Sequence, residues 1–282
     1  MRRLGYVWLV GAGPGDPELL TRKAARCLEE ADLVLYDALV SAEVLRLAPR
    51  AQCFSVGKRC GGCGVRQETI HKLMIRAARR GRRIVRLKCG DPFVLGRGGE
   101  EAIALAVAGV PFEVVPGVTT AVAASALAGV PVTHRGLASG FAVVSGHDEE
   151  AYGPILRSLL PDSLTVVVLM GLRTRDRLAA KLIEGGWAPA TPAAIFLGAS
   201  TASHHAWIGT LDTLATAPLP AAPADLPGTI VIGRVVSLAS ILARHAESSV
   251  SAHAVGERHT GGRQPALGPG ALDRRVAVVV AH

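Results

Sequence analysis

Short apolar runs alternate with amphipathic segments along the first 130 residues of the chain. The runs are rich in Val, Leu and Ile, as is typical of strands buried in a parallel sheet. The segments between them have a helical period, and glycines close two of them, at Gly81 and Gly109. The predicted strands are Tyr6–Val10, Leu33–Tyr36, Cys53–Val56, Ile84–Leu87 and Phe112–Val115, and the predicted helices are Pro17–Glu30, Ser41–Leu47, Arg66–Arg80, Glu100–Ala108 and Thr119–Ala128. This alternation predicts an α/β fold with a mostly parallel sheet and with sites at the carboxyl ends of its strands.

The pattern pauses around residues 132–138, and a second set of apolar runs follows. Its predicted strands are Phe141–Ser145, Leu164–Met170, Ala193–Leu197, Ala206–Gly209 and Thr229–Gly233, and its predicted helices are Glu149–Leu159, Arg173–Glu184 and Val236–Arg244. We therefore expect an N-terminal α/β domain over residues 1–135 and a C-terminal α/β domain, with more hairpin character, over residues 136–244. Residues 245–282 lack a period apart from the run Val276–Val280, which predicts a poorly ordered tail.

The composition indicates a globular protein. Of the 282 residues, 49% are hydrophobic and 19% are charged. No apolar run reaches the roughly 18 residues that a membrane-spanning helix requires. The start, MRRLGYVWLVGAGPGD, enters a glycine turn after a short apolar run and lacks the usual cleavage site of a signal peptide. We interpret this run as a first strand and expect a cytoplasmic protein.

The five cysteines do not predict a disulfide framework, because their number is odd and they are scattered along the chain. Cys60 and Cys63 have the spacing of half a zinc site, but no second pair of ligands follows at a suitable distance. We therefore expect no metal.

The net charge of +8 is concentrated in the first third of the chain. Residues 1–100 contain 19 Lys and Arg against 10 Asp and Glu, whereas the remaining 182 residues contain 12 against 13. Such a basic region fits either a nucleic acid or a small polyanion. Aromatic residues, which stack on unpaired bases, make up only 4% of the chain, so the composition favours the small polyanion and no nucleic acid.

Two glycine turns follow predicted strands and share the sequence Gly-Asp-Pro, at residues 15–17 and 90–92. Neither suits a phosphate, because Asp91 repels an anion and Pro14 and Pro92 offer no N–H group. Asp16 is a predicted N-cap with Pro17 at the first helical position. A cationic or zwitterionic ligand without phosphate fits such turns better, and S-adenosylmethionine is such a ligand.

Eight sequence blocks together resemble the tetrapyrrole methylase family. They are, in order, VGAGPGDPELLT, LYDALVS, VGKR, GDPFVLGRGGEE, VPGVTTA, GVPVTHRGLA, SGH and MGL, and the resemblance extends from about residue 5 to residue 240. The resemblance implies two α/β domains with the cofactor cleft between them, and a homodimer. It also implies S-adenosylmethionine-dependent C-methylation of uroporphyrinogen III at two ring carbons, C2 and C7, which gives precorrin-2 for sirohaem or cobalamin.

The resemblance further implies a set of cofactor-binding residues. They are Pro14, Cys89, Gly90, Asp91, Val94, Thr119, Thr120, Met170, Gly198, Ala199 and Gly228. Two positions depart from the family pattern: Cys89 stands where members usually have glycine, and Leu95 where an aromatic residue is common. Cys89 is tolerated if its φ is negative and strained if the turn requires a positive φ.

Asp37 and Lys58 are the candidate catalytic residues by this resemblance, as proton acceptor and proton donor. A pyrrole carbon that attacks a methyl group becomes part of a cationic ring, which a carboxylate stabilises and deprotonates. A helix-terminal acid is the structural alternative for Asp37, and carboxylate binding is the alternative for Lys58. The candidates for binding the carboxylates of the tetrapyrrole are Arg59, Arg97, His134 and Arg135.

Three other functions fit parts of this pattern. A methylase of the same fold could act on a later corrin intermediate, since substrate choice depends on loops. The basic region permits an RNA methyltransferase, which the scarcity of aromatic residues disfavours. Cys89 in the cofactor loop makes a purely binding or regulatory protein conceivable.

Overall fold

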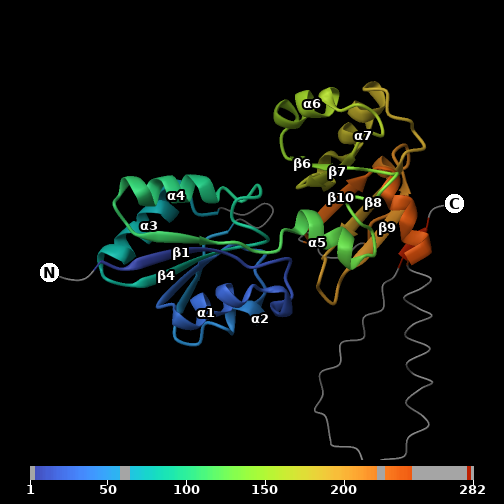
Figure 1. Ribbon diagram of the computed structural model, residues 1–282. Helices are drawn as coiled ribbons and strands as arrows, with labels where there is room; N and C mark the ends of the chain where they lie inside the picture. The colour runs from blue at the N-terminus through green and yellow to red at the C-terminus, as the bar shows by residue number, and fades with distance from the viewer. Residues whose placement is uncertain (1–3, 58–63, 221–225, 243–277, 281–282) are drawn as a thin grey trace, which may run out of the picture. The chain divides into compact units, whose positions relative to one another are not determined.

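The computed structural model describes residues 4–57, 64–220 and 226–242, and the backbone of residues 278–280. The described chain forms two compact units. The first contains residues up to 123 together with 199–201 and 226–227, and the second contains residues 124–198, 202–220 and the described residues from 228 onwards. Figure 1 shows a sheet flanked by helices in each unit, as the alternation of apolar runs predicts. No helix among the described residues is long and apolar enough to cross a membrane.

The sheet of the first unit contains five parallel strands in the order β3-β2-β4-β1-β5. The strands are β1 (Tyr6–Gly11), β2 (Leu33–Tyr36), β3 (Gln52–Ser55), β4 (Arg83–Lys88) and β5 (Phe112–Val115). The helices are α1 (Arg22–Glu30), α2 (Ala42–Leu45), α3 (Gln67–Arg79), α4 (Gly98–Val107) and α5 (Thr120–Leu127), which continues into the second unit. The parallel sheet is therefore confirmed, and all five carboxyl ends lie at one edge.

Helices cover both faces of this sheet. Figure 1 shows α3 and α4 on one face and α1 and α2 on the other. Alternate residues of a strand point to opposite faces, and Leu33 and Leu35 of β2 pack in the core under α3 and α4. Val34 of β2, with Val85 and Leu87 of β4, packs in the core under α1 and α2.

The predicted helix Pro17–Glu30 is divided into two. Residues Pro17–Leu19 form a 3-10 helix, and the Asp16 side chain caps it by accepting a hydrogen bond from the Glu18 N–H, as predicted. The chain is extended at Leu20, and α1 begins at Arg22 because the Thr21 side chain accepts a hydrogen bond from the Ala24 N–H.

The sheet of the second unit is mixed, in the order β11-β9-β8-β10-β7-β6. Its strands are β6 (Phe141–Ser145), β7 (Thr165–Leu169), β8 (Pro192–Leu197), β9 (His205–Thr210), β10 (Gly228–Ile232) and β11 (Val278–Val280). The pairs β8–β9, β8–β10 and β7–β10 are antiparallel, and the pairs β6–β7 and β9–β11 are parallel. The predicted α/β fold with late hairpin character is confirmed.

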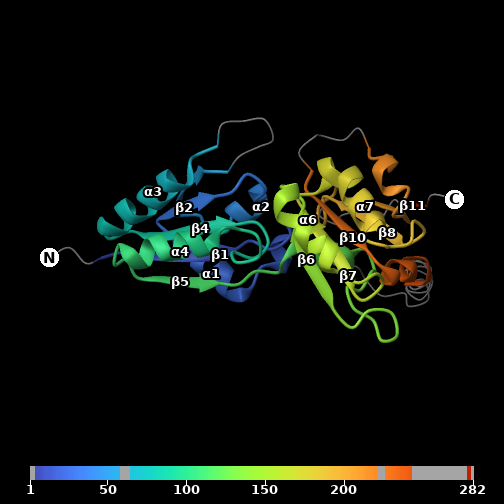
Figure 2. The ribbon, with the colours of Figure 1, turned by 90° about the horizontal axis from the view of Figure 1, so that it is seen from above.

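Helices α6 (Glu149–Ser158) and α7 (Arg175–Glu184) lie side by side over this sheet (Figure 2). Their buried residues, among them Tyr152 and Leu178, share one core with Trp187 and Trp207. Short 3-10 helices lie at Leu172–Thr174, Leu214–Thr216 and Arg234–Leu238, so the predicted helix Val236–Arg244 begins as a 3-10 turn.

The predicted tail lies largely outside the described residues. The poor order expected of residues 245–282 stays a prediction. Within them, Val278–Val280 is β11, which pairs in parallel with β9. Their main-chain groups bond to an edge strand that would otherwise leave its own groups unpaired. The predicted division of the chain at residues 135 and 136 stays a prediction.

Candidate functional site

Three glycines meet at the carboxyl edge of the first sheet, where β1, β4 and β5 end. A Cβ atom placed on Gly11 would lie 2.5 Å from the Gly90 carbonyl oxygen and 2.6 Å from the Gly117 Cα. A Cβ atom on Gly117 would lie 2.3 Å from the same carbonyl oxygen. The backbones therefore lie too close together for a side chain at Gly11 or Gly117, whereas a Cβ atom on Gly90 would lie no nearer than 3.5 Å to any atom around it.

The turns that follow β1 and β4 are bonded to each other. The Gly13 N–H donates to the Gly90 carbonyl over 3.2 Å, and the Gly90 N–H donates to the Gly13 carbonyl over 2.7 Å. Both residues have a left-handed backbone, with φ of +68° at Gly13 and +66° at Gly90. The two Gly-Asp-Pro turns thus share one edge of the sheet, and the buried Pro14 follows Gly13 there.

Asp91 uses both of its carboxylate oxygens on the backbone. Its Oδ1 accepts a hydrogen bond from the Phe93 N–H over 2.8 Å, and its Oδ2 accepts one from the Gly117 N–H over 3.1 Å. The side chain therefore ties the loop after β4 to the loop after β5. The N–H groups that a phosphate would use in these loops are already bonded within the protein.

Cys89 adopts an ordinary backbone conformation. Among the described residues, positive φ angles outside glycine occur at Leu95, Arg97, Asp162, Met170 and Ser200. Gly90 therefore supplies the left-handed turn, and Cys89 fits without strain. The Cys89 Sγ lies 3.8 Å from the Gly13 carbonyl oxygen, and burial, followed by the charge of Asp37, raises the pKa of this thiol to about 11.

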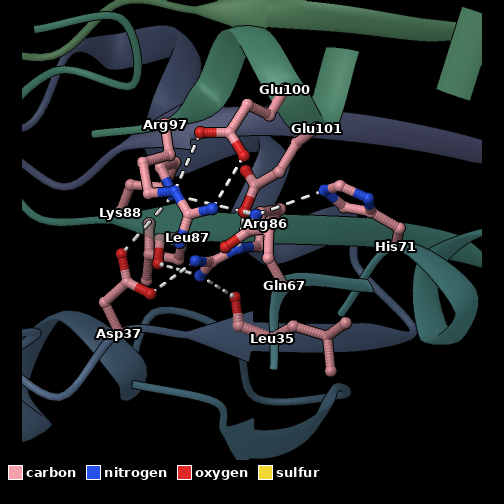
Figure 3. Close-up of polar contacts among 10 residues, drawn as sticks. All are labelled: Leu35, Asp37, Gln67, His71, Arg86, Leu87, Lys88, Arg97, Glu100 and Glu101. Carbon is pink, nitrogen blue, oxygen red and sulfur yellow. Dashed lines mark hydrogen bonds and ion pairs between the residues drawn. The ribbon is translucent and has the colours of Figure 1, made fainter. Parts of the chain in front are cut away.

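A cluster of four charged side chains, formed by Asp37, Arg86, Lys88 and Glu101, lies beside these turns (Figure 3). Arg86 and Lys88 occupy alternate positions of β4, on the face opposite Val85 and Leu87. The Arg86 guanidinium donates to Asp37 Oδ1 over 2.5 Å and to Glu101 Oε1 over 2.8 Å. The Lys88 ammonium lies 3.6 Å from Asp37 Oδ2 and 3.3 Å from Glu101 Oε1.

Three members of this charged cluster are buried. The side chains of Arg86, Lys88 and Glu101 are 2%, 3% and 0% exposed, whereas that of Asp37 is 29% exposed. Burial disfavours the charge on Arg86, but Asp37 and Glu101 outweigh it and raise the Arg86 pKa. Burial and then the charge of Arg86 lower the pKa of Lys88. Asp37 is thus the member that presents its charge to solvent.

The remaining predicted residues of the first unit lie near the glycine turns or beyond them. Thr119 and Thr120 are close to Gly90, whose Cβ position would be 3.5 Å from the Thr120 nitrogen. The Val94 N–H donates to the Asp91 carbonyl. Arg97, at the start of α4, is exposed and makes two hydrogen bonds to Glu100, of 2.8 and 2.7 Å. Ala199 also belongs to this unit, beside Ser200, whose Oγ accepts a hydrogen bond from the Asp16 N–H.

Three predicted residues meet at one edge of the second sheet. Met170 follows β7, Gly198 follows β8, and Gly228 begins the antiparallel strand β10. Gly228 pairs with Leu197, and Thr229 pairs with Leu169, so the three positions are neighbours. Met170 is exposed and has a φ of +59°.

His134 and Arg135 lie in a turn of the second unit. The turn is closed by hydrogen bonds between the backbones of His134 and Ala138, and both predicted residues are exposed. The predicted residues Lys58 and Arg59 lie outside the described residues, as do Cys60 and Cys63.

Sequence reasoning missed Arg86, Lys88 and Glu101. The sequence contained a signal for the two cations, because Arg86 and Lys88 alternate with the apolar residues Val85 and Leu87 at the end of a predicted strand. Charges in a strand that is covered on both faces require partners. The partners themselves lie 15 and 49 residues from Arg86 in the sequence, and only the fold brings them together.

The sequence was compared with known proteins. The family described as Tetrapyrrole (Corrin/Porphyrin) Methylases matches residues 6–215. A uroporphyrinogen-III C-methyltransferase of Bacillus subtilis is 43% identical over 237 residues, which are 83% of this chain and 92% of the relative. A protein named siroheme synthase 2 of Aeromonas hydrophila is 46% identical over 242 residues, or 85% of this chain, and this chain spans about half of it, 51%.

A solved structure is similar in both sequence and fold. It is the uroporphyrin-III C-methyl transferase of Thermus thermophilus complexed with S-adenyl homocysteine, which is 45% identical. The TM-score is 0.70, and the match covers 83% of this chain and 100% of the other. Because the family matches residues 6–215, which are most of the chain, and the relatives are more than 40% identical, the chain belongs to the tetrapyrrole (corrin/porphyrin) methylases.

Proposed function

We propose that this chain transfers methyl groups from S-adenosylmethionine to uroporphyrinogen III, at C2 and C7, and releases precorrin-2. The observation that carries the proposal is the 43% identity to the Bacillus subtilis uroporphyrinogen-III C-methyltransferase over 92% of that protein. The charged cluster supports it, since Asp37 presents a carboxylate at the edge of the sheet where α/β proteins bind ligands.

The glycine turns fit a ligand without phosphate. Asp91 occupies the N–H groups of Phe93 and Gly117, and Gly13 and Gly90 bond to each other. What these turns still offer is close backbone approach and negative charge, which suit a sulfonium compound such as S-adenosylmethionine. When bound, that molecule supplies an electrophilic methyl group. The proposed contacts are the cofactor-binding residues that the family resemblance implies.

Asp37 has the central role in the proposed reaction. As a ring carbon bonds to the methyl group, the bond from that methyl group to the sulfonium sulfur would break and S-adenosylhomocysteine would leave. The positive charge would then lie on the pyrrole, where the Asp37 carboxylate stabilises it. Asp37 Oδ1 or Oδ2 then accepts the proton that the ring loses. Lys58 is the proposed proton donor, and Arg59, Arg97, His134 and Arg135 are proposed to bind substrate carboxylates. Alignment of the two substrates supplies much of the rate, because methyl transfer needs little other acid–base help.

The proposal is tested by product mass. We expect purified protein, incubated anaerobically and under reducing conditions with S-adenosylmethionine and uroporphyrinogen III, to form a product heavier by two methyl groups. Methylation of a later corrin intermediate, or of RNA, without reaction of uroporphyrinogen III would contradict the proposal. A homodimeric state and a cytoplasmic location belong to the same proposal, and gel filtration at several protein concentrations tests the former.

A further inference from the structure

The Arg86 guanidinium is fixed at four points. Its NH1 group donates to the carbonyls of Leu35 and Leu87 over 3.3 and 3.2 Å. Its Nε donates to Glu101 Oε1 over 2.8 Å, and its NH2 group donates to Asp37 Oδ1 over 2.5 Å. Because a guanidinium is planar and rigid, the first three bonds determine the direction of the fourth.

Glu101 is the part of this arrangement that lies deepest. It lies in the first turn of α4 with its side chain fully buried, and its Oε1 accepts hydrogen bonds from Arg86, Lys88 and Gln67 (Figure 3). Its Oε2 is also buried and has no hydrogen-bond partner among the described residues. Figure 3 shows the Arg86 guanidinium between Glu101 and Asp37.

The stability of the core does not explain why these charges are buried. Buried ion pairs contribute little net stability, since desolvation offsets their attraction, and apolar side chains of similar size are often as stable. A buried carboxylate oxygen without a partner adds a further cost. The charged cluster does orient the Asp37 carboxylate. Arg86 pairs with Asp37 Oδ1 and Lys88 with Asp37 Oδ2, and Glu101 Oε1 pairs with both cations.

We propose that Arg86 and Glu101 are positioning residues, which hold the Asp37 carboxylate at the carboxyl edge of the sheet in the orientation that methyl transfer requires. Glu101 acts through Arg86 and Lys88, and it touches neither substrate. The proposal rests on the proposed function, because it gives Asp37 its role in the reaction.

A double-mutant cycle between Glu101 and Asp37 tests the proposal. Glu101→Gln removes the charge of the side chain but keeps its size and one oxygen that accepts hydrogen bonds. We expect it to lower kcat roughly ten- to a hundredfold, as small displacements of reacting groups do, while KM and the Kd for S-adenosylhomocysteine stay within about twofold. In an Asp37→Asn background, the same substitution should leave kcat unchanged, because the group it positions is already gone.

Two further variants separate positioning from stability. Arg83→Gln removes an arginine of the same strand that pairs with Glu30 and Asp32 at the opposite end, and kcat should stay unchanged. Arg86→Lys keeps the positive charge but loses the planar fork, so kcat should fall as it does in Glu101→Gln. Equal losses from Glu101→Gln with and without Asp37, or no loss in the wild-type background, would overturn the proposal.

The same experiments distinguish this proposal from the proposed function. If the wild-type protein adds no methyl groups to uroporphyrinogen III, the proposed function fails. Crystal structures of the wild type and of Glu101→Gln then provide the test. A changed orientation of the Asp37 carboxylate in the variant is the expected result, and an Asp37 side chain that keeps its position and its bond to Arg86 overturns the positioning proposal.

Discussion

Cys89 lies at the end of β4, between a buried strand and the left-handed Gly90. Its surroundings determine its chemistry. Burial and then the negative charge of Asp37 disfavour the thiolate of Cys89, which raises the pKa of this thiol to about 11 from an ordinary value of 9.0. The thiol is therefore protonated at neutral pH and behaves as a small apolar side chain in the loop.

This protonated state predicts slow alkylation. At pH 8 the two-unit increase in pKa reduces the thiolate fraction about a hundredfold relative to an ordinary thiol, and the rate should rise about tenfold per pH unit up to pH 11. Timed iodoacetamide labelling with peptide mass analysis measures the rate, with the same cysteine in urea-unfolded protein as the ordinary thiol. Cys89 that reacts as fast in the native protein as in urea would contradict the shifted pKa.

At the scale of elements, Gly11 and Gly117 allow the end of β1 and the loop after β5 to lie against the Gly90 carbonyl in the loop after β4. Gly117→Ala would place its Cβ 2.3 Å from the Gly90 carbonyl oxygen. The Gly90 backbone is bonded to Gly13, and the Gly117 N–H is bonded to Asp91, so neither residue can move away without straining these bonds. We expect the free energy of unfolding to fall by about 3 kcal/mol, the upper end for overpacking. Urea denaturation measures this change.

Gly99→Ala is the matched control. Gly99 is exposed in α4, and no heavy atom lies within 4 Å of its Cβ position. Alanine favours a helix by up to about 1 kcal/mol over glycine, so this variant should be as stable as the wild type or more stable. Equal losses in both variants would show that the close approach of Gly117 to Gly90 is not the cause.

The elements themselves follow closely from the apolar runs. Strands β2 and β5 have the predicted bounds, because short apolar runs between polar turns favour strands of a parallel sheet that helices cover. The helix after β1 was predicted too long. The Thr21 side chain caps α1 and so begins a new helix. The apolar positions continue with a helical spacing across Thr21, so the pattern alone does not reveal the break.

The charged cluster could not be predicted from the sequence in the same way. Asp37 and Arg86 are 49 residues apart, and they meet because β2 lies beside β4 in the sheet. Strand order is a property of the whole unit, which no local pattern specifies. The meeting of the two glycine turns, in contrast, follows from the sequence, because each turn follows a strand of one parallel sheet and such strands end on the same side.

At the scale of the whole molecule, the uneven distribution of charge has a kinetic consequence. The excess of nine positive charges in residues 1–100, from 19 basic and 10 acidic residues, suits a substrate with many carboxylates. We expect the KM for uroporphyrinogen III to rise several-fold between about 50 and 500 mM NaCl, since salt screens attraction between separated charges.

Initial rates at the two salt concentrations measure this effect. The KM for S-adenosylmethionine is the control, because that molecule carries little net charge and should respond weakly. A substrate KM that does not change with salt would show that contacts other than long-range charge determine binding.

The two faces of β4 differ in charge, and this difference bears on the pairing of the strand. Val85 and Leu87 belong to an apolar core on one face, while Arg86 and Lys88 have their counter-ions on the other. A slip of one residue in the pairing of β4 with β1 or β2 would exchange the faces and leave two cations among aliphatic side chains. The charges that pair with Asp37 and Glu101 therefore also favour the native register of β4, because a slipped register would bury them without counter-ions.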